Sequence, residues 1–391
     1  MGDLTTLCSV FAGLHNSVFS AGLANTRLHP LAQPSVLLRE TLPSDAPRLL
    51  EVARSGNFRT LNFPSDLDGL THKIDRSRLS FRREIADPAL QEMMFTVLER
   101  NGRDDYVPVG TSTFFPQHGT ARKPHHAYQV VPGTRVDDAG LVHDDTVLQL
   151  IQNHAGPAEV GGLIVHADRS AGRVPYGRAV SWVRFFWTSL PGRRADYANR
   201  LCLTEILPPF VETPEGGRTN AFYEAHARRF FEDRTYEEMD KLTNADCSLI
   251  TARLPRTVRL ADMPSEARAL IGVPRKESRP ALRLLEKVGF KPTGQVDPID
   301  AGPHFLGAFA DNPIFTGAHD LIYGGTSHRE DEIPNWHYGF VGRERHSDDA
   351  AFRAALGAFL VMDDLLLTTR EIADFLDLRV GSLEPVTAVA L

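Results

Sequence analysis

The sequence has few cysteines, no excess of basic residues and no long apolar run. Its 391 residues include only three cysteines, Cys8, Cys202 and Cys247, which lie far apart and form no C-x-x-C pair. Neither a disulfide framework nor a zinc site is therefore expected, and a reducing cytoplasm fits best. The formal net charge of −7 argues against broad nucleic-acid binding, because no basic field would attract phosphate backbones.

Several motifs are missing as well. No window approaches a membrane-spanning helix, and no basic region precedes the short apolar run near the N-terminus, so neither membrane insertion nor secretion is expected. The chain has no G-x-S-x-G elbow, no H-E-x-x-H and no phosphate loop ending in G-K-S/T. Covalent acyl-enzyme chemistry therefore has no support, and no metal is predicted.

Apolar periodicity divides the chain into three parts. Residues 1–34 are predicted to be a poorly ordered extension. Between residues 35 and 300, strands and amphipathic helices alternate, and the stretches 94–100, 107–115, 200–210 and 247–255 are among the predicted strands. From 301 to 391 short apolar runs surround one short helix, which predicts a small β-rich subdomain.

Residues 116–146 interrupt this pattern with a polar stretch rich in proline, glycine and histidine. Long loops in compact domains are often lids or binding segments, but a solvated insertion is an equal alternative. The adjacent His125 and His126 are predicted to be solvated.

A strand, a loop with glycines and arginines, and a helix follow one another between residues 159 and 187. The glycines allow a bulge or a close backbone approach, and the helix start with its arginines would attract a diphosphate. A simple connecting turn remains the alternative, because the pattern is loose. The candidate residues are Gly161, Gly162, Leu163, Arg169, Gly172, Arg173, Gly177 and Arg178.

Three further residues are candidates for catalysis. Glu205 interrupts the apolar stretch LCLTEILPP, and an acid in a buried strand is usually paired or functional. His154 immediately precedes the glycine-containing strand, and His304 lies in GPHF. Either histidine would otherwise be an ordinary loop residue.

Several of these segments occur in an order that resembles one known family. They are NHAGPAEVGGLIVHADRSAG, YGRAVSWVRF, NAFYEAHARRFF, LIGVPRKESRPALRLLEKVGF and the closing MDDLLLTTREIADFLDLRVGSLEPVTAVAL. Over roughly residues 36–391 the chain resembles the arginine N-succinyltransferases. The resemblance implies an α/β (α+β) fold of the GNAT acyltransferase type. Its features would be a mixed, mostly antiparallel sheet, flanking helices and a C-terminal β-rich subdomain.

The resemblance also implies succinyl-CoA or another acyl-CoA as co-substrate and an arginine-like amine as acceptor. The family's acyl-CoA contact matches Leu163, and its catalytic histidine, a proton donor, matches Arg275. Arginine is a poor general acid. Arg275 would therefore stabilise the leaving thiolate by its charge, or His154 or His304 would replace the acid, while Glu205 would be the base.

The replacement at Arg275 leaves other functions open. The chain could use another acyl donor or amine, it could be a catalytically impaired subunit of a hetero-oligomer, or it could be a CoA-binding protein without catalysis. Assembly with copies of itself or with a related chain is compatible with each function.

Overall fold

The computed structural model describes residues 29–56, 63–102, 105–121, 123–170, 172–327, 335–345 and 349–391. Most of the predicted N-terminal extension, residues 1–28, lies outside this part of the chain. Residues 29–34 contact the C-terminal half, where the hydroxyl of Tyr338 donates to the carbonyl oxygen of Pro34 at 2.9 Å. Every helix within the described ranges is too short or too polar to cross a lipid bilayer.

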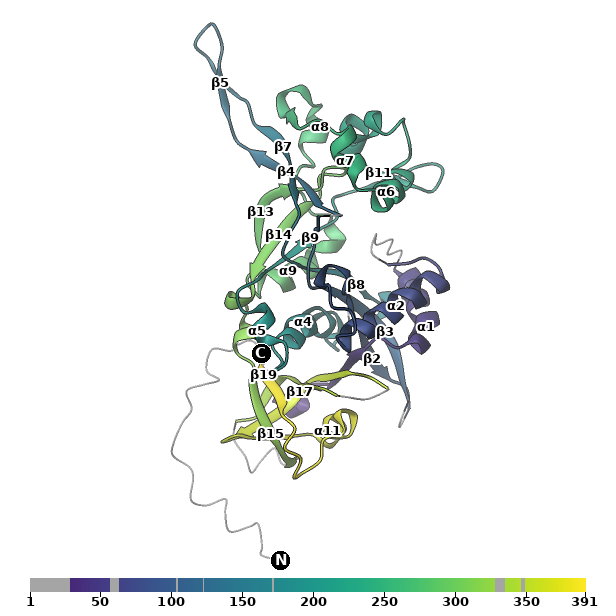
Figure 1. Ribbon diagram of the computed structural model, residues 1–391, viewed down its shortest axis with the longest axis vertical. Coiled ribbons are helices and arrows are strands. Elements are labelled where there is room, and N and C mark those ends of the chain that lie inside the picture. Colours follow the sequence, from purple (N-terminus) through teal and green to yellow (C-terminus); the bar gives the residue numbers. More distant parts are fainter. Residues whose placement is uncertain are drawn as a thin grey trace, which may run out of the picture.

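One sheet connects fifteen of the described strands and follows the long axis of the molecule (Figure 1). Its order is β12-β7-β4-β13-β14-β9-β8-β3-β2-β1-β17-β16-β19-β15-β18. Neighbouring strands are antiparallel except in the pairs β8–β9 and β15–β18, which are parallel. The predicted mixed, mostly antiparallel sheet is thus confirmed. The strands are β1 (Val36–Glu40), β2 (Met93–Arg100), β3 (Tyr106–Phe115), β4 (His125–Val131), β5 (Thr134–Val136), β6 (Val142–Asp144), β7 (Val147–Asn153), β8 (Ala158–Val165), β9 (Leu201–Glu205), β10 (Val211–Glu212), β11 (Arg218–Thr219), β12 (Thr257–Arg259), β13 (Lys291–Val296), β14 (Pro303–Ala308), β15 (His319–Thr326), β16 (His337–Glu344), β17 (Phe352–Met362), β18 (Leu365–Thr368) and β19 (Val386–Ala390).

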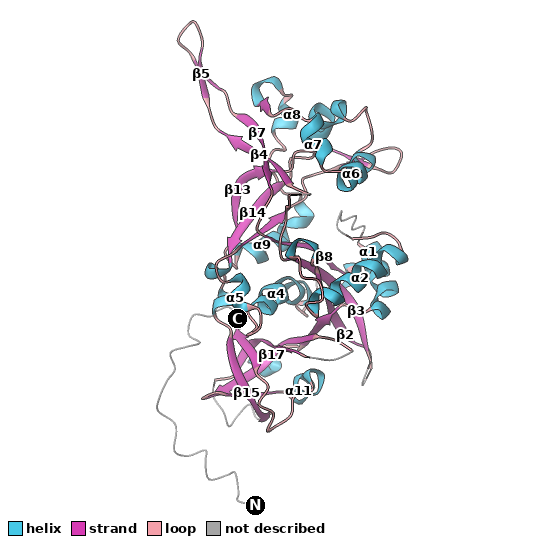
Figure 2. Cartoon of the chain, in the orientation of Figure 1, coloured by secondary structure: helices cyan, strands magenta, loops and turns pink. Residues whose placement is uncertain are grey.

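Helices cover both faces of the central strands (Figure 2). Side chains alternate along β2, so Met94 packs with Leu49 and Ile74 of α1 and α2, while Phe95 lies against Trp187 of α4. Helix α4 has apolar residues on all sides and is accordingly almost wholly buried. The helices are α1 (Ala46–Ser55), α2 (Leu67–Phe81), α3 (Ala167–Ser170), α4 (Tyr176–Thr188), α5 (Arg194–Tyr197), α6 (Tyr236–Ala245), α7 (Ser248–Arg253), α8 (Ser265–Arg268), α9 (Arg279–Glu286), α10 (Pro313–Thr316) and α11 (Arg370–Leu376).

The last five strands close into a ring. β17 pairs with β16 and β18, β19 with β16 and β15, and β15 with β18. Phe359, Leu366 and Ile372 belong to the core of this ring. The ring accounts for most of the predicted β-rich subdomain, but β14 pairs with β9 and β13 in the other half of the molecule. The boundary at residues 300 and 301 stays a prediction.

One predicted strand is wrong. Residues 247–255 contain helix α7 rather than a strand. The carboxylate of Asp246 accepts hydrogen bonds from the backbone N–H and the hydroxyl of Ser248, at 3.1 and 2.6 Å, and these bonds begin a helical turn. Tertiary packing onto the core around Tyr128 and Met239 then outweighs the strand preference of a short apolar run.

The polar stretch 116–146 forms strands rather than a long loop. β4 pairs along its whole length with β7, and the two-stranded ribbon β5–β6 extends beyond them (Figure 1). Because β4 lies inside the sheet, His126 is 5% exposed and the side chain of His125 is 8% exposed. The prediction that both histidines are solvated is wrong.

Candidate functional site

A gap between two parallel strands forms the candidate site. β8 and β9 pair only through Ala158 with Cys202 and through Glu159 with Leu203. Beyond these pairs the strands separate and border a cavity of about 160 Å³. It is lined by Glu159, Val160, Gly161, Gly162, Leu163, Arg184, Thr204, Glu205, Ile206, Leu207, Arg275, Ser278, Ala281, Leu285, Asp297, Asp300 and Gly302.

A bulge in β8 produces the separation. Opposite β3, Thr111 pairs with Ile164 and Thr113 with Gly161, so β8 holds one residue more than β3 between these pairs. Gly162 has φ +59°, and a Cβ atom there would lie 2.9 Å from the hydroxyl oxygen of Thr113. Only glycine fits this conformation without strain. The bulge expected from the paired glycines is therefore present.

Arg184 of α4 brings a buried positive charge to the cavity. Its guanidinium donates to the carbonyl oxygen and hydroxyl of Ser181 at 2.8 and 3.2 Å, and to the carbonyl oxygen of Gly161 at 3.4 Å. No carboxylate pairs with it among the residues that the structure describes, and burial lowers its pKa to about 10. A buried arginine without an anionic partner is suited to bind a ligand carboxylate.

Carboxyl groups and a second arginine line the other parts of the cavity. Burial raises the pKa of Asp300 to about 6, although the hydroxyl of Tyr236 donates to it at 2.7 Å. Burial and the charge of Asp300 also raise the pKa of Asp297. Arg275 donates through Nε to the hydroxyl of Ser278 at 2.9 Å, and burial lowers its pKa. The cavity thus contains cationic and acidic groups within one small volume.

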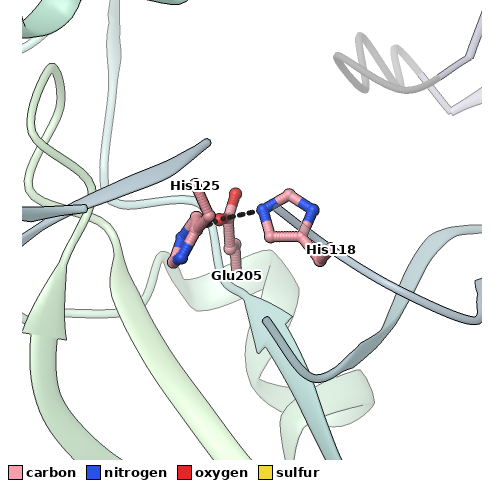
Figure 3. A group of neighbouring side chains, drawn as sticks. All are labelled: His118, His125 and Glu205. Carbon is pink, nitrogen blue, oxygen red and sulfur yellow. Dashed lines mark ion pairs between the residues drawn. The ribbon is translucent and has the colours of Figure 1, made fainter. Parts of the chain in front are cut away.

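Three histidines surround Glu205 at the end of β9. Its Oε1 atom lies 3.0 Å from Nε2 of His125, 3.6 Å from Nε2 of His118 and 3.8 Å from Nε2 of His304. His125 approaches the carboxylate from the start of β4, and His118 approaches it from the loop before β4 (Figure 3). Burial alone would raise the pKa of Glu205, but the surrounding histidines hold it well below its usual range.

A second carboxylate orients His118. Its Nδ1 atom lies 2.6 Å from Oε2 of Glu159, so Nε2 is turned toward Glu205. Burial opposes protonation of His118, but Glu159 and Glu205 outweigh it and raise its pKa well above the usual value. The loop that carries His118 is fixed by a close approach, because a Cβ on Gly156 would lie 1.8 Å from the carbonyl oxygen of His118.

The residues predicted for the site divide into two groups. Gly161, Gly162, Leu163, Glu205 and Arg275 line the cavity. His304 is buried beside Glu205 as its cross-strand neighbour, and burial lowers its pKa to about 4.

The other predicted residues do not line the cavity. His154 is exposed at the end of β7. In the predicted diphosphate loop, Arg169 is paired with Glu99 at 2.8 Å, while Gly172 and Arg173 are exposed. Gly177 and Arg178 lie in the first turn of α4, with Arg178 over the rings of Trp182 and Tyr338.

Sequence reasoning missed His118, His125, Glu159 and Arg184. Glu159 and Arg184 carried a signal, because each is a charged residue within an apolar strand or helix, as Glu205 is. His118 and His125 carried none, because their position depends on the pairing of β4 with strands far along the chain.

A larger cavity of about 540 Å³ lies elsewhere, between the end of α4 and the ring. Its arginines are already paired, Arg343 with Glu384 at 2.8 Å and Arg345 with Asp377 at 2.8 Å. Arginines that are already paired with carboxylates are poorly suited to bind a charged ligand. The smaller cavity between β8 and β9 is therefore the better candidate.

Known proteins resemble this chain in sequence and in fold. Residues 36–312 match the family of the arginine N-succinyltransferase beta subunit. The arginine N-succinyltransferase subunit beta of Pseudomonas aeruginosa is 27% identical over 271 residues, which cover 68% of this chain and 75% of that protein. The solved structure of arginine/ornithine succinyltransferase subunit AI from Pseudomonas aeruginosa superimposes with a TM-score of 0.70. This match covers 91% of this chain and 98% of that one at 18% identity.

Proposed function

Because the chain belongs to the arginine N-succinyltransferase family, we propose that it transfers the succinyl group of succinyl-CoA to the amino group of an arginine-like amine. The separation of β8 and β9 carries this proposal. Backbone N–H and C=O groups that face a gap between strands can pair with an extended ligand that contains amides, such as the pantetheine arm of CoA. The N–H near Leu163 would polarise the thioester carbonyl.

The start of α4 supports a place for the diphosphate of CoA. No side chain caps this helix. The N–H of Tyr176 donates to the carbonyl oxygen of Val174 at 2.9 Å, and the next N–H groups, of Gly177 and Arg178, are available to an anion. Arg173 is exposed in the loop before it and Arg178 lies in its first turn. Arg169 contributes less to this site, since Glu99 already binds it.

Arg184 supports a donor with a free carboxylate. Succinyl-CoA carries such a group and acetyl-CoA does not, so the guanidinium of Arg184 would favour succinyl transfer. The amine would bind toward Glu205 and Asp300, whose negative charges attract a guanidinium or an ammonium group.

The transfer needs no covalent enzyme intermediate. The substrate ammonium loses a proton and its nitrogen attacks the thioester carbonyl carbon. The nitrogen then loses a second proton as the C–S bond breaks, and CoA leaves as a thiolate that takes up a proton. Glu205 would accept the first proton through water, and Arg275 would stabilise the thiolate by its charge. His154 and His304 are less suited to donate the last proton. His154 lies outside the cavity, and His304 is neutral at pH 7.

A thiol-release assay tests the proposal. Succinyl-CoA and acetyl-CoA are each offered with arginine, with ornithine and without amine. We expect release that requires both an amine and succinyl-CoA, that is lost in Glu205→Gln and that partly survives in Arg275→Ala. Tight CoA binding without release for any amine would instead indicate the CoA-binding alternative.

A further inference from the structure

The proposed acyl transfer uses Glu205 but none of the three histidines around it. The group combines side chains from four places in the chain, namely the loop before β4, the start of β4, the end of β9 and β14. One potential ligand atom each from His118, His125 and Glu205 lies within 4.8 Å of the other two. Figure 3 shows both rings beside the carboxylate.

Hydrogen bonding accounts for His118 but not for the other two rings. Nε2 of His125 is buried and lies 3.0 Å from Glu205, yet it is not aligned for a hydrogen bond. Both ring nitrogens of His304 are buried without a hydrogen-bond partner in the described part of the chain. A buried polar atom without a partner costs about 1–3 kcal/mol, so several such atoms that converge on one point require an explanation.

No protonation state of the three rings gives every buried ring nitrogen a partner among the residues that the structure describes. If all three rings were protonated, their positive charges would face a single carboxylate, with the ring centroids of His118 and His125 only 4.5 Å apart. A neutral ring can turn a protonated Nε2 toward Glu205, but Nε2 of His125 is not aligned for such a bond and both ring nitrogens of His304 have no partner in the described part of the chain. A divalent cation among them would bind the nitrogen lone pairs and the carboxylate together.

Glu159 completes the pattern. Histidines that bind a metal through one ring nitrogen usually donate the other ring N–H to a carboxylate or carbonyl oxygen, which fixes the ring. Nδ1 of His118 lies 2.6 Å from Glu159, which leaves Nε2 directed at Glu205.

We propose that His118, His125 and Glu205 bind a divalent transition metal of the zinc type, with His304 close enough to complete the coordination. Imidazole nitrogens with one carboxylate favour zinc, cobalt or nickel over magnesium or calcium, which prefer oxygen ligands. The inference goes beyond the proposed function, because metal binding is measurable on the protein alone. All three histidines face Oε1 of Glu205, so Oε2 is the oxygen that would accept the substrate proton.

The test titrates the full chain, stripped of metals with a chelator, with Zn²⁺ by calorimetry and with Co²⁺ by visible absorption. We expect one metal per chain and the intense absorption of low-coordinate cobalt. Zn²⁺ should also raise the melting temperature. The substitutions His118→Gln and His125→Gln should each weaken binding at least ~100-fold, and Glu159→Gln by about 10–100-fold.

The matched control is His126→Gln, which replaces the neighbouring buried histidine, whose Nε2 lies 2.9 Å from Gln152 instead. It should bind metal as the unaltered protein does. The proposal would be overturned if the folded His118→Gln and His125→Gln variants bound metal as tightly as the unaltered protein. It would also be overturned if the Co²⁺ added to the protein gave only the spectrum of the free aqueous ion. His118→Gln keeps this test decisive, because His118 is on a loop and partly exposed. Thiol release from metal-free protein is scored separately, so failure of acyl transfer and failure of metal binding remain distinguishable.

Discussion

Two buried arginines, one in each half of the molecule, have opposite surroundings. In the ring, Arg343 donates to Glu384 at 2.8 Å and to the carbonyl oxygens of Leu376 and Asp377 at 3.0 and 2.6 Å. Beside the β8–β9 cavity, Arg184 has hydroxyl and carbonyl partners but no carboxylate within the described ranges. The comparison indicates that the ring uses its arginine for stability, whereas the cavity keeps one available for a ligand.

The largest effect is expected from Arg184→Met. Loss of the guanidinium removes the proposed partner of the succinyl carboxylate, and such a buried charged contact is worth about 2–5 kcal/mol. We expect kcat/KM for succinyl-CoA to fall at least ~30-fold, with little change for acetyl-CoA. Thermal unfolding should show little net change in stability, because removal of an unpaired buried charge offsets the lost hydrogen bonds to the carbonyl oxygens of Ser181 and Gly161. Equal losses with both donors would contradict a role in donor selection.

Arg343→Met should give the reverse result. The carbonyl oxygens of Leu376 and Asp377 would lose their donor, and we expect the free energy of unfolding to fall by about 2–4 kcal/mol. Activity per folded molecule should stay the same, as measured by thiol release at a temperature where the variant is fully folded. A change of substrate preference would show that the two arginines are not functionally distinct.

Gly162→Ala should have a moderate effect on both stability and binding. The added Cβ meets the hydroxyl of Thr113 at 2.9 Å, and a non-glycine residue at φ +59° is strained by roughly 1–2 kcal/mol. We expect a lower melting temperature and a raised KM for acyl-CoA, since the bulge borders the gap. Gly192→Ala is the control and should change neither, because an added Cβ would come no closer than 3.5 Å to its neighbours and the residue lies away from the β8–β9 cavity.

The smallest effect concerns pH. The pKa of Asp300 is about 6 in the folded protein, above the usual value near 3.8, so the folded state binds more protons between these values. The contribution of Asp300 to the free energy of unfolding is therefore fully present below pH ~4 and is lost as the pH rises through ~6. Melting temperatures measured from pH 4 to pH 7 should show a weaker decline in Asp300→Asn. Melting temperatures that fall equally with pH in Asp300→Asn and in the unaltered protein would show that Asp300 does not cause the decline.

The sequence predicted those parts of the site that depend on neighbouring residues. The bulge follows from adjacent glycines in an apolar strand, and Glu205 was recognisable as an acid in another apolar strand. Arg184 lies in the apolar helix VSWVRFFW and could have been found by the same reasoning.

The remaining parts depend on contacts between distant segments. His125 reaches Glu205 because β4, β13, β14 and β9 are consecutive in the sheet, and a polar local sequence contains no sign of that order. Helix α7 was mistaken for a strand because a short segment with few apolar residues, Leu249, Ile250 and Ala252, is compatible with both structures.

The position of His118 links the two strands of the gap mechanically. Glu159 on β8 holds one side of its ring and Glu205 at the end of β9 faces the other side, so the ring spans the place where the strands diverge. A ligand that widens or narrows this gap must change the distance between the two carboxylates. Thermodynamic reciprocity then requires that whatever binds at the histidines alters acyl-CoA affinity by the same factor as acyl-CoA alters theirs. We expect calorimetry to show that the metal changes the affinity for acyl-CoA by the same factor as acyl-CoA changes the affinity for the metal.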